Sequence, residues 1–213
     1  MDIAIGVVAH TARLTQAQQL ANQVNANYIS VDDGTLGVEA NHRKVWEKLA
    51  RHNADWCLVL EDDAQPVDNF TDQLHSTLAV APSPAVSLYL GHHQHWHWYP
   101  ARQKRLAEAG AQADQQDACW IMSSDIAHGV AVAIQTEIVA DMLNHTQHSK
   151  RPIDYAVRQW LRDTGRAYAF SWPSLVDHAD WPTLVKHHDR RPRKQPRKAW
   201  RVGGRDTWTA EAI

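Results

Sequence analysis

The stretch CLVLEDDAQP, residues 57–66, joins an apolar run to three consecutive carboxylates, Glu61, Asp62 and Asp63. An uninterrupted apolar run of this kind is typical of a strand that is buried on both faces of a parallel sheet. Three like charges at the end of such a strand repel one another and lose hydration, so a cation or hydrogen-bond donors must compensate them. The stretch therefore predicts a buried strand that ends in a charged site.

Strand and helix patterns alternate before this stretch. Residues 3–9 (IAIGVVA) and 28–31 (YISV) are short runs rich in β-branched residues, and apolar residues at helical spacing separate them over residues 15–24. A second helical pattern fills residues 38–49, directly before the strand at residues 56–60. This alternation predicts an α/β fold in one domain, with a mostly parallel sheet and helices on both faces.

The second half of the chain has weaker patterns. Residues 86–90 (VSLYL) and 129–134 (GVAVAI) are strand candidates, and residues 92–116 form a long excursion with at most one helix. Another helix is predicted between Pro152, which suits a first turn, and Gly165, which suits a helix end.

Composition limits the class of protein. A chain of 213 residues with 44% hydrophobic residues can bury the core of one sizeable domain. No run of eighteen apolar residues and no signal peptide pattern is present, so we expect a cytoplasmic protein. The cysteines, Cys57 and Cys119, lack metal-ligand or redox spacing, and we expect buried thiols.

The charge is distributed unevenly. Residues 1–185 carry 13 Lys and Arg against 21 Asp and Glu, a net charge of −8, whereas residues 186–213 carry 9 against 3, a net charge of +6. We therefore divide the chain into a domain over residues 1–185 and a basic segment over residues 186–213. This segment could recruit a polyanionic partner, fold back on the acidic body or stay solvated.

Polar residues follow each predicted strand where a parallel sheet would bind a ligand. His10 and Thr11 follow the first strand, Asp32 and Asp33 follow the second, and the acidic triplet follows the third. The carboxylate oxygens among these residues are hard ligands that suit Mg²⁺ or Mn²⁺, and a substrate diphosphate could bind the same ion. No GxGxxG or GxxxxGK[ST] motif follows the first strand, which disfavours a dinucleotide site and a P-loop.

Three segments carry a resemblance to a known family: VDDG at residues 31–34, NHRKVW at residues 41–46 and LVLEDDA at residues 58–64. Together they resemble a GT-A-type glycosyltransferase of the lipopolysaccharide and collagen galactosyltransferase family, in which EDD is a variant of the Asp-x-Asp motif. The resemblance covers residues 3–70. It implies a GT-A-like fold, a nucleotide-sugar donor, a hydroxyl-bearing acceptor, which could be polyanionic, and Mn²⁺ or Mg²⁺ as cofactor.

The resemblance also implies roles for individual residues. PSLVDHAD, residues 173–180, is similar to a late loop that supplies a metal-binding histidine in such enzymes, so the metal ligands would be Asp63 and His178. Glu61 and Asp62 would lie near the nucleotide ribose or diphosphate. The further candidates for nucleotide-sugar binding lie at the ends of the first two strands and on the following helix; they are His10, Thr11, Asp32, Asp33, Asn41 and Lys44.

The reaction also needs a general base that is separate from the metal-bound acids. Asp154 is the first candidate, because it lies in the first turn of the helix after Pro152 and such a position faces the acceptor cleft in the family that the chain resembles. Its alternative role is to stabilise the helix dipole. Asp125 is the second candidate.

Two other functions remain open from the residues alone. A metal-dependent hydrolase of phosphate esters or glycosides could use the paired acids to activate water. A non-catalytic nucleic-acid-binding module could use the basic segment. The histidines of residues 92–97 fit no standard zinc site, and we interpret them as acceptor-loop or surface residues.

Overall fold

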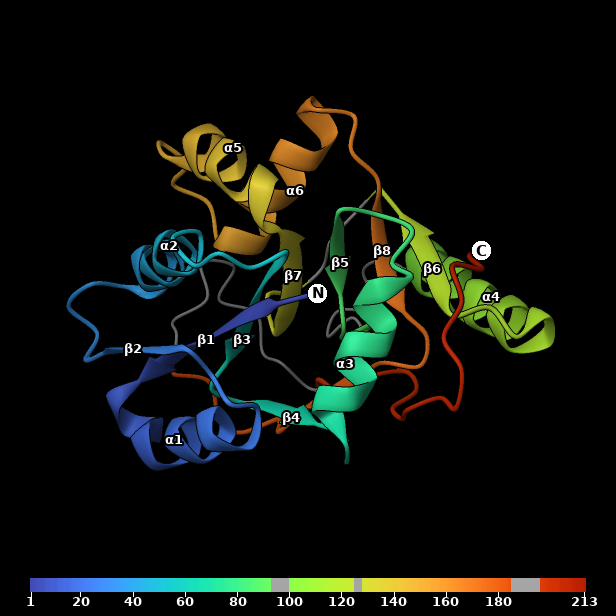
Figure 1. Cartoon of the computed structure of the whole chain (residues 1–213), viewed down its shortest axis with the longest axis horizontal. Helices are drawn as coiled ribbons and strands as arrows, with labels where there is room; N and C mark the ends of the chain where they lie inside the picture. Colours follow the sequence, from blue (N-terminus) through green and yellow to red (C-terminus); the bar gives the residue numbers. More distant parts are fainter. Residues whose placement is uncertain (93–99, 125–127, 185–195) are drawn as a thin grey trace.

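The computed structural model describes residues 1–92, 100–124, 128–184 and 196–213. Within these ranges, seven strands form one mixed sheet across the middle of the molecule (Figure 1). Their order is β2 (Tyr28–Asp32), β1 (Ile3–His10), β3 (Trp56–Glu61), β7 (Ala131–Gln135), β5 (Ala85–Ser87), β8 (Tyr168–Ser171) and β6 (Trp120–Ser123). A separate pair, β4 (Ala64–Pro66) and β9 (Val176–His178), forms a small antiparallel sheet.

Most strands of the large sheet share one direction. Strand β1 pairs in parallel with β2 and β3, and β5 pairs in parallel with β8. Strand β7 runs antiparallel between β3 and β5, and β6 is antiparallel to β8 at the edge. The predicted α/β fold with a mostly parallel sheet is therefore confirmed.

Helices cover both faces of the sheet, as predicted (Figure 1). Two helices pack against one face: α1 (Leu14–Gln23) and α3 (Phe70–Ala79). The helices of the other face share a second core; they are α2 (Val38–Leu49), α4 (Pro100–Gln116), α5 (Thr136–Thr146) and α6 (Ile153–Asp163). A short 3₁₀ helix, η1 (Thr11–Arg13), links β1 to α1.

The apolar run in β3 reflects these two covered faces. Leu58 and Leu60 belong to the core beneath α1 and α3, whereas Cys57 and Val59 belong to the core beneath α2, α5 and α6. All four side chains are buried. Because neither face of β3 contacts water, its sequence has no polar alternation.

The second half contains elements that the sequence patterns did not reveal. Strands β6 and β8 are each four residues long, which is too short for a clear period. Helix α5 begins at Thr136, directly after β7 ends at Gln135, so no turn residue marks the boundary. The predicted helix near residues 152–165 is confirmed as α6, with Pro152 at its N-cap and Gly165 in the left-handed region (φ 64°) after its end.

The described part of the C-terminal segment, residues 196–213, folds back over the far edge of the sheet. The backbone N–H of Met122 in β6 donates to Ile213 O, and Trp208 is buried with its indole N–H donating to Gln73 Oε1. Its basic side chains form ion pairs with carboxylates of the acidic body; the pairs are Arg197 with Asp180, Lys198 with Asp177, Arg201 with Asp114 and Arg205 with Asp117. The boundary drawn at residue 185 stays a prediction, because residues 185–195 lie outside the described ranges.

Replacing Trp208 by alanine should therefore destabilise the domain. The change removes a buried indole and leaves a cavity between α3 and the β6 edge, and large-to-small changes of this kind cost about 3–5 kcal/mol. We expect the free energy of unfolding in urea to fall by about that amount. A loss of under about 1 kcal/mol would mean that the segment contributes little to the folded core.

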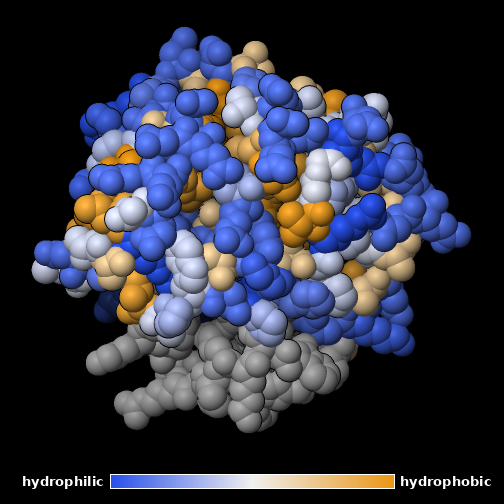
Figure 2. Space-filling view, turned by 90° about the horizontal axis from the view of Figure 1, so that it is seen from below, coloured by the Kyte–Doolittle hydropathy of each residue, from blue (hydrophilic) through white to orange (hydrophobic). Residues whose placement is uncertain are grey.

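The surface is polar over the face that Figure 2 shows, with hydrophobic residues in small groups between hydrophilic ones. Among the residues that the structure describes, none of the helices has the length and apolarity needed to cross a bilayer.

Candidate active site

The carboxyl ends of three neighbouring strands meet at one edge of the sheet. The parallel register pairs His10 at the end of β1 with Asp32 at the end of β2, and it pairs Val8 with Glu61 at the end of β3. The polar residues that follow these strands in the sequence are thereby brought to one edge. The acidic triplet lies at this edge.

Arg13 supplies the counter-charge for the triplet. Its Nη1 donates to Asp62 Oδ1 and to Asp63 Oδ2, both at 2.8 Å, and its side chain is only 11% exposed. Asp62 Oδ2 also accepts a 2.9 Å hydrogen bond from the backbone N–H of His10. The compensation that the sequence required thus comes from the loop after β1.

The same arginine connects the triplet to the loop after β9. Arg13 Nη2 donates to Pro182 O at 2.7 Å, and its guanidinium lies 5.5 Å from the ring centroid of Trp181. Burial opposes the charge on Arg13, but the hydrogen bond to Asp62 and the two neighbouring carboxylates raise its pKa. Arg13 therefore stays charged and joins three segments of the chain.

Asp63 and His178 lie side by side at the start of the small sheet. Strand pairing places Ala64 opposite His178, and Asp63 Oδ2 lies 3.4 Å from His178 Nε2. The backbone N–H of Asp180 donates to His178 Nδ1 at 2.7 Å, so a neutral imidazole carries its proton on Nε2, toward Asp63. Burial and the charges of Glu61 and Asp62 raise the pKa of Asp63 to about 6, and burial together with Arg197 lowers the pKa of His178 to about 4.

The Asp63 and His178 pair fits a divalent cation. Asp63 Oδ1 is buried and has no hydrogen-bond partner in the described part of the chain, although a buried carboxylate oxygen is costly to leave unpaired. A carboxylate and an imidazole are suitable ligands for Mn²⁺, although a bond to Nε2 needs the other imidazole tautomer and the loss of the hydrogen bond from Asp180 N–H to Nδ1. Among the described residues, no group of three or more His, Cys, Asp and Glu could hold a metal, so diphosphate oxygens and water would complete the shell.

Glu61 is held by a histidine from α2. Its Oε1 lies 3.3 Å from His42 Nε2, and a Cβ at Gly129 would come within 2.9 Å of the same oxygen. Burial acts to raise the pKa of Glu61, but its contact with His42 holds that pKa below the ordinary value. The absence of a side chain at Gly129 leaves room for this carboxylate. His42 belongs to the NHRKVW segment, which is the signal that could have singled it out.

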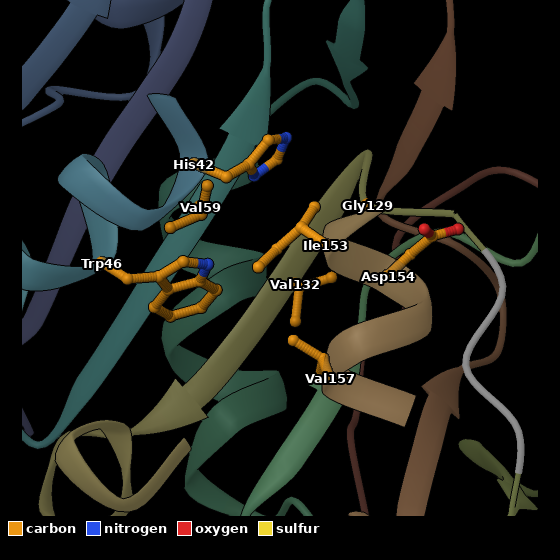
Figure 3. Close-up of a pocket in the computed structure, with 8 residues that line it drawn as sticks. All are labelled: His42, Trp46, Val59, Gly129, Val132, Ile153, Asp154 and Val157. Carbon is orange, nitrogen blue, oxygen red and sulfur yellow. The ribbon is translucent and has the colours of Figure 1, made fainter. Parts of the chain in front are cut away.

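Asp154 lines a pocket between α2 and α6 together with His42 and Gly129 (Figure 3). In the view of Figure 3, His42 and Asp154 lie on opposite sides of an apolar group, and the carboxylate of Asp154 points away from Trp46. Burial and the charge of Glu61 raise the pKa of Asp154, although the backbone N–H of Tyr155 donates to its Oδ1 at 2.9 Å. A raised pKa suits a group that must take up a proton.

The carboxylates after β2 already bind backbone groups. Asp32 accepts 2.9 Å hydrogen bonds from the N–H groups of Leu36 and Gly37, and Asp33 accepts from the N–H and hydroxyl of Thr35. These bonds order the loop that leads into α2. In this arrangement both residues shape the edge of the site.

The remaining predicted binding residues differ in position. Asn41 is buried and its Nδ2 donates to Ala9 O and Ser30 O, at the ends of β1 and β2. Thr11 in η1 and Lys44 in α2 are exposed. Asp125 lies outside the described residues, as do residues 93–97 of the histidine cluster.

Comparison with known proteins identifies the family of the chain. The family model of glycosyltransferase family 25 (LPS biosynthesis protein) matches residues 9–157, which include the acidic triplet and Asp154. The chain therefore belongs to glycosyltransferase family 25 and is a nucleotide-sugar glycosyltransferase. This assignment confirms the predicted family and decides among the three predicted functions.

Solved structures with a similar arrangement share little sequence with the chain. A CMP:2-keto-3-deoxy-manno-octonic acid synthetase with CTP has a TM-score of 0.43 and 11% identity, over 80% of this chain and 89% of that one. A mutant Drosophila beta-1,4-galactosyltransferase 7 with manganese, UDP-Gal and xylobiose has a TM-score of 0.41 and 10% identity, over 90% of this chain and 75% of that one. A glycosyltransferase involved in the glycosylation of the major capsid of PBCV-1 has a TM-score of 0.41 and 10% identity, over 78% of this chain and 80% of that one. The search of curated proteins found no match.

The raised pKa of Asp63 predicts how stability depends on pH. In the metal-free protein the folded state retains a proton on Asp63 that the unfolded chain releases near pH 4, so ionisation disfavours folding. The contribution of Asp63 to the free energy of unfolding should fall by on the order of 3 kcal/mol as pH rises from about 4 to about 6. Urea unfolding of wild type and Asp63→Asn across this range tests it. Parallel stability curves would contradict the raised pKa.

Proposed function

We propose that the protein transfers a sugar from a nucleotide-diphosphate donor to a hydroxyl-bearing acceptor, with Mn²⁺ or Mg²⁺ bound by Asp63 and His178. The observation that carries this proposal is the buried, unpartnered Oδ1 of Asp63, whose other carboxylate oxygen, Oδ2, lies 3.4 Å from His178 Nε2. When bound, the ion would stabilise the charge that develops on the leaving diphosphate. The description of the family as an LPS biosynthesis protein favours a glycan hydroxyl as the acceptor.

The chain's own residues would position the donor. Arg13 and Asp62 order the loop after β1, where the diphosphate would lie against the triplet. His42 Nε2 lies 3.3 Å from Glu61 Oε1, and His42 and Asp154 line one small pocket, so the proposed base would lie near the triplet. Positioned groups lower the barrier because they need no reorganisation during the reaction.

Asp154 would act as the general base in a direct displacement. As the acceptor oxygen forms its bond to the sugar carbon and the bond from that carbon to the diphosphate breaks, the hydroxyl proton passes to the Asp154 carboxylate. The partly buried position and raised pKa of Asp154 support this role, because an ordinary carboxylate is a weak base at neutral pH. Asp125 remains the second candidate.

Ligand-dependent stability tests the proposed function. Wild-type protein is heated with a panel of nucleotide sugars and nucleoside diphosphates, each with Mn²⁺, with Mg²⁺ or with EDTA, because a ligand of the folded state raises the melting temperature. We expect at least one nucleotide sugar to raise it with metal and to lose most of this effect in EDTA. If none does so with either metal, the proposed donor and cofactor are wrong.

A further inference from the structure

Arg13 occupies the position of a counter-cation between two carboxylates. One nitrogen, Nη1, donates to both Asp62 and Asp63, and the other, Nη2, donates to the carbonyl of Pro182. The side chain is largely buried and packs beside Trp181. Arg13 is therefore held in place from both sides of the acidic site.

This position conflicts with metal binding to the free protein. A divalent ion on Asp63 would lie about 2–2.6 Å from the carboxylate that Arg13 contacts at 2.8 Å, so two cations would share one carboxylate in a poorly solvated site. The triplet carries three negative charges at most, and its member Glu61 faces His42, with Oε1 3.3 Å from His42 Nε2. Without a further anion, the charge of Arg13 opposes the charge of the ion.

A bound diphosphate would remove this conflict. It brings negative charges that both cations can contact, and the guanidinium of arginine suits bidentate contact with phosphate oxygens. Arg13 lies in the loop directly after β1, which is where a parallel sheet presents groups to a ligand. The arginine can therefore exchange a carboxylate partner for a phosphate partner.

We propose that Arg13 keeps divalent metal out of the free site and contacts the donor diphosphate when metal and donor bind together. This inference rests on the proposed function, since it needs a diphosphate donor and a metal at Asp63. Metal and nucleotide then raise each other's affinity. The diphosphate offsets the repulsion between Arg13 and the ion, and the ion offsets the repulsion between the diphosphate and the carboxylates. Arg13 sets the strength of that coupling.

Binding of Mn²⁺ alone tests the inference without any turnover. Free Mn²⁺ is measured by electron paramagnetic resonance in titrations of wild type, Arg13→Gln and Arg13→Lys. We expect Arg13→Gln to bind Mn²⁺ about tenfold tighter than wild type, whereas Arg13→Lys stays close to wild type because it keeps the charge. If Arg13 only supported the fold, Arg13→Gln would instead bind Mn²⁺ more weakly than wild type, because Asp62 and Asp63 would be disordered.

Two further variants control for charge and folding. Arg201→Gln removes an arginine that pairs with Asp114, away from the triplet, and should leave Mn²⁺ affinity unchanged. Trp181→Leu removes the ring beside Arg13 and should raise Mn²⁺ affinity by a smaller factor, which keeps the test available if Arg13→Gln does not fold. Melting temperatures confirm which variants are folded.

Repeating the titrations with saturating UDP, GDP, CDP or ADP measures the coupling. In wild type the effective nucleotide should raise Mn²⁺ affinity, and in Arg13→Gln this gain should shrink by about tenfold. Equal or weaker binding of Mn²⁺ alone by folded Arg13→Gln and Trp181→Leu would overturn the inference and leave the proposed function intact. If no nucleotide raises Mn²⁺ affinity in wild type, the proposed function itself fails.

Discussion

Asp63→Asn should reduce metal-dependent binding of the donor below detection while the fold stays intact. The substitution keeps the side-chain volume nearly constant but removes the negative charge and the free carboxylate oxygen that the ion would bind. Calorimetric titration of wild type and variant with Mn²⁺ and the nucleotide sugar found by thermal shift measures the loss. The metal-free variant should melt no earlier than wild type at neutral pH, because burial disfavours the ionised form of Asp63.

Two companion variants make this result specific. Asp72→Asn removes an exposed acid from the first turn of α3 and should leave donor affinity unchanged. His178→Ala should weaken donor binding in the same direction as Asp63→Asn but less, since one of two protein ligands is lost. Unchanged donor affinity in a folded Asp63→Asn variant would rule out Asp63 as a metal ligand.

Asp154→Asn should lower turnover by on the order of 10²-fold or more, with donor affinity and melting temperature close to wild type. The amide cannot take up the acceptor proton, but it still fits the start of α6 and can accept from Tyr155 N–H. Turnover is measured as nucleoside diphosphate released at saturating donor and acceptor. Because the pKa of Asp154 is raised, wild-type turnover should also fall as pH drops and the base becomes protonated.

Glu137→Gln provides the matched control for Asp154. Glu137 is an exposed acid in the first turn of α5, so its loss removes the same kind of helix-dipole stabilisation, about 0.3–1 kcal/mol, without touching the site. We expect normal turnover in this variant. If Asp154→Asn behaves in the same way, with a lower melting temperature and normal turnover, Asp154 only stabilises its helix and the base lies elsewhere.

The strand ends could be predicted from the sequence because they depend on local patterns. The apolar run before Glu61 and the alternation with helices define parallel strands, and parallel strands bring their carboxyl ends to one edge. The family segment at residues 41–46 lies on α2, where it brings His42 to Glu61. The strand ends required no knowledge of long-range contacts, whereas the contact between His42 and Glu61 was not predicted.

The role of Arg13 could not be predicted in this way. Nothing in the local pattern after β1 distinguishes Arg13 from an exposed arginine, because its contacts with Asp62 and Asp63 lie about fifty residues away in sequence. The same is true of Arg197, whose ion pair with Asp180 depends on the return of the C-terminal segment. Charge compensation was predictable as a requirement, whereas the residue that provides it depends on tertiary packing.

A divalent ion should bind at Asp63 and His178 together with the donor diphosphate. Anomalous diffraction at the manganese edge, from crystals grown with Mn²⁺ and the nucleoside diphosphate that binds most tightly, tests it most directly. We predict one strong peak within bonding distance, about 2–2.6 Å, of an Asp63 carboxylate oxygen, the His178 imidazole and the diphosphate. A bound nucleoside diphosphate with no manganese peak beside Asp63 would show that Asp63 and His178 do not bind the ion.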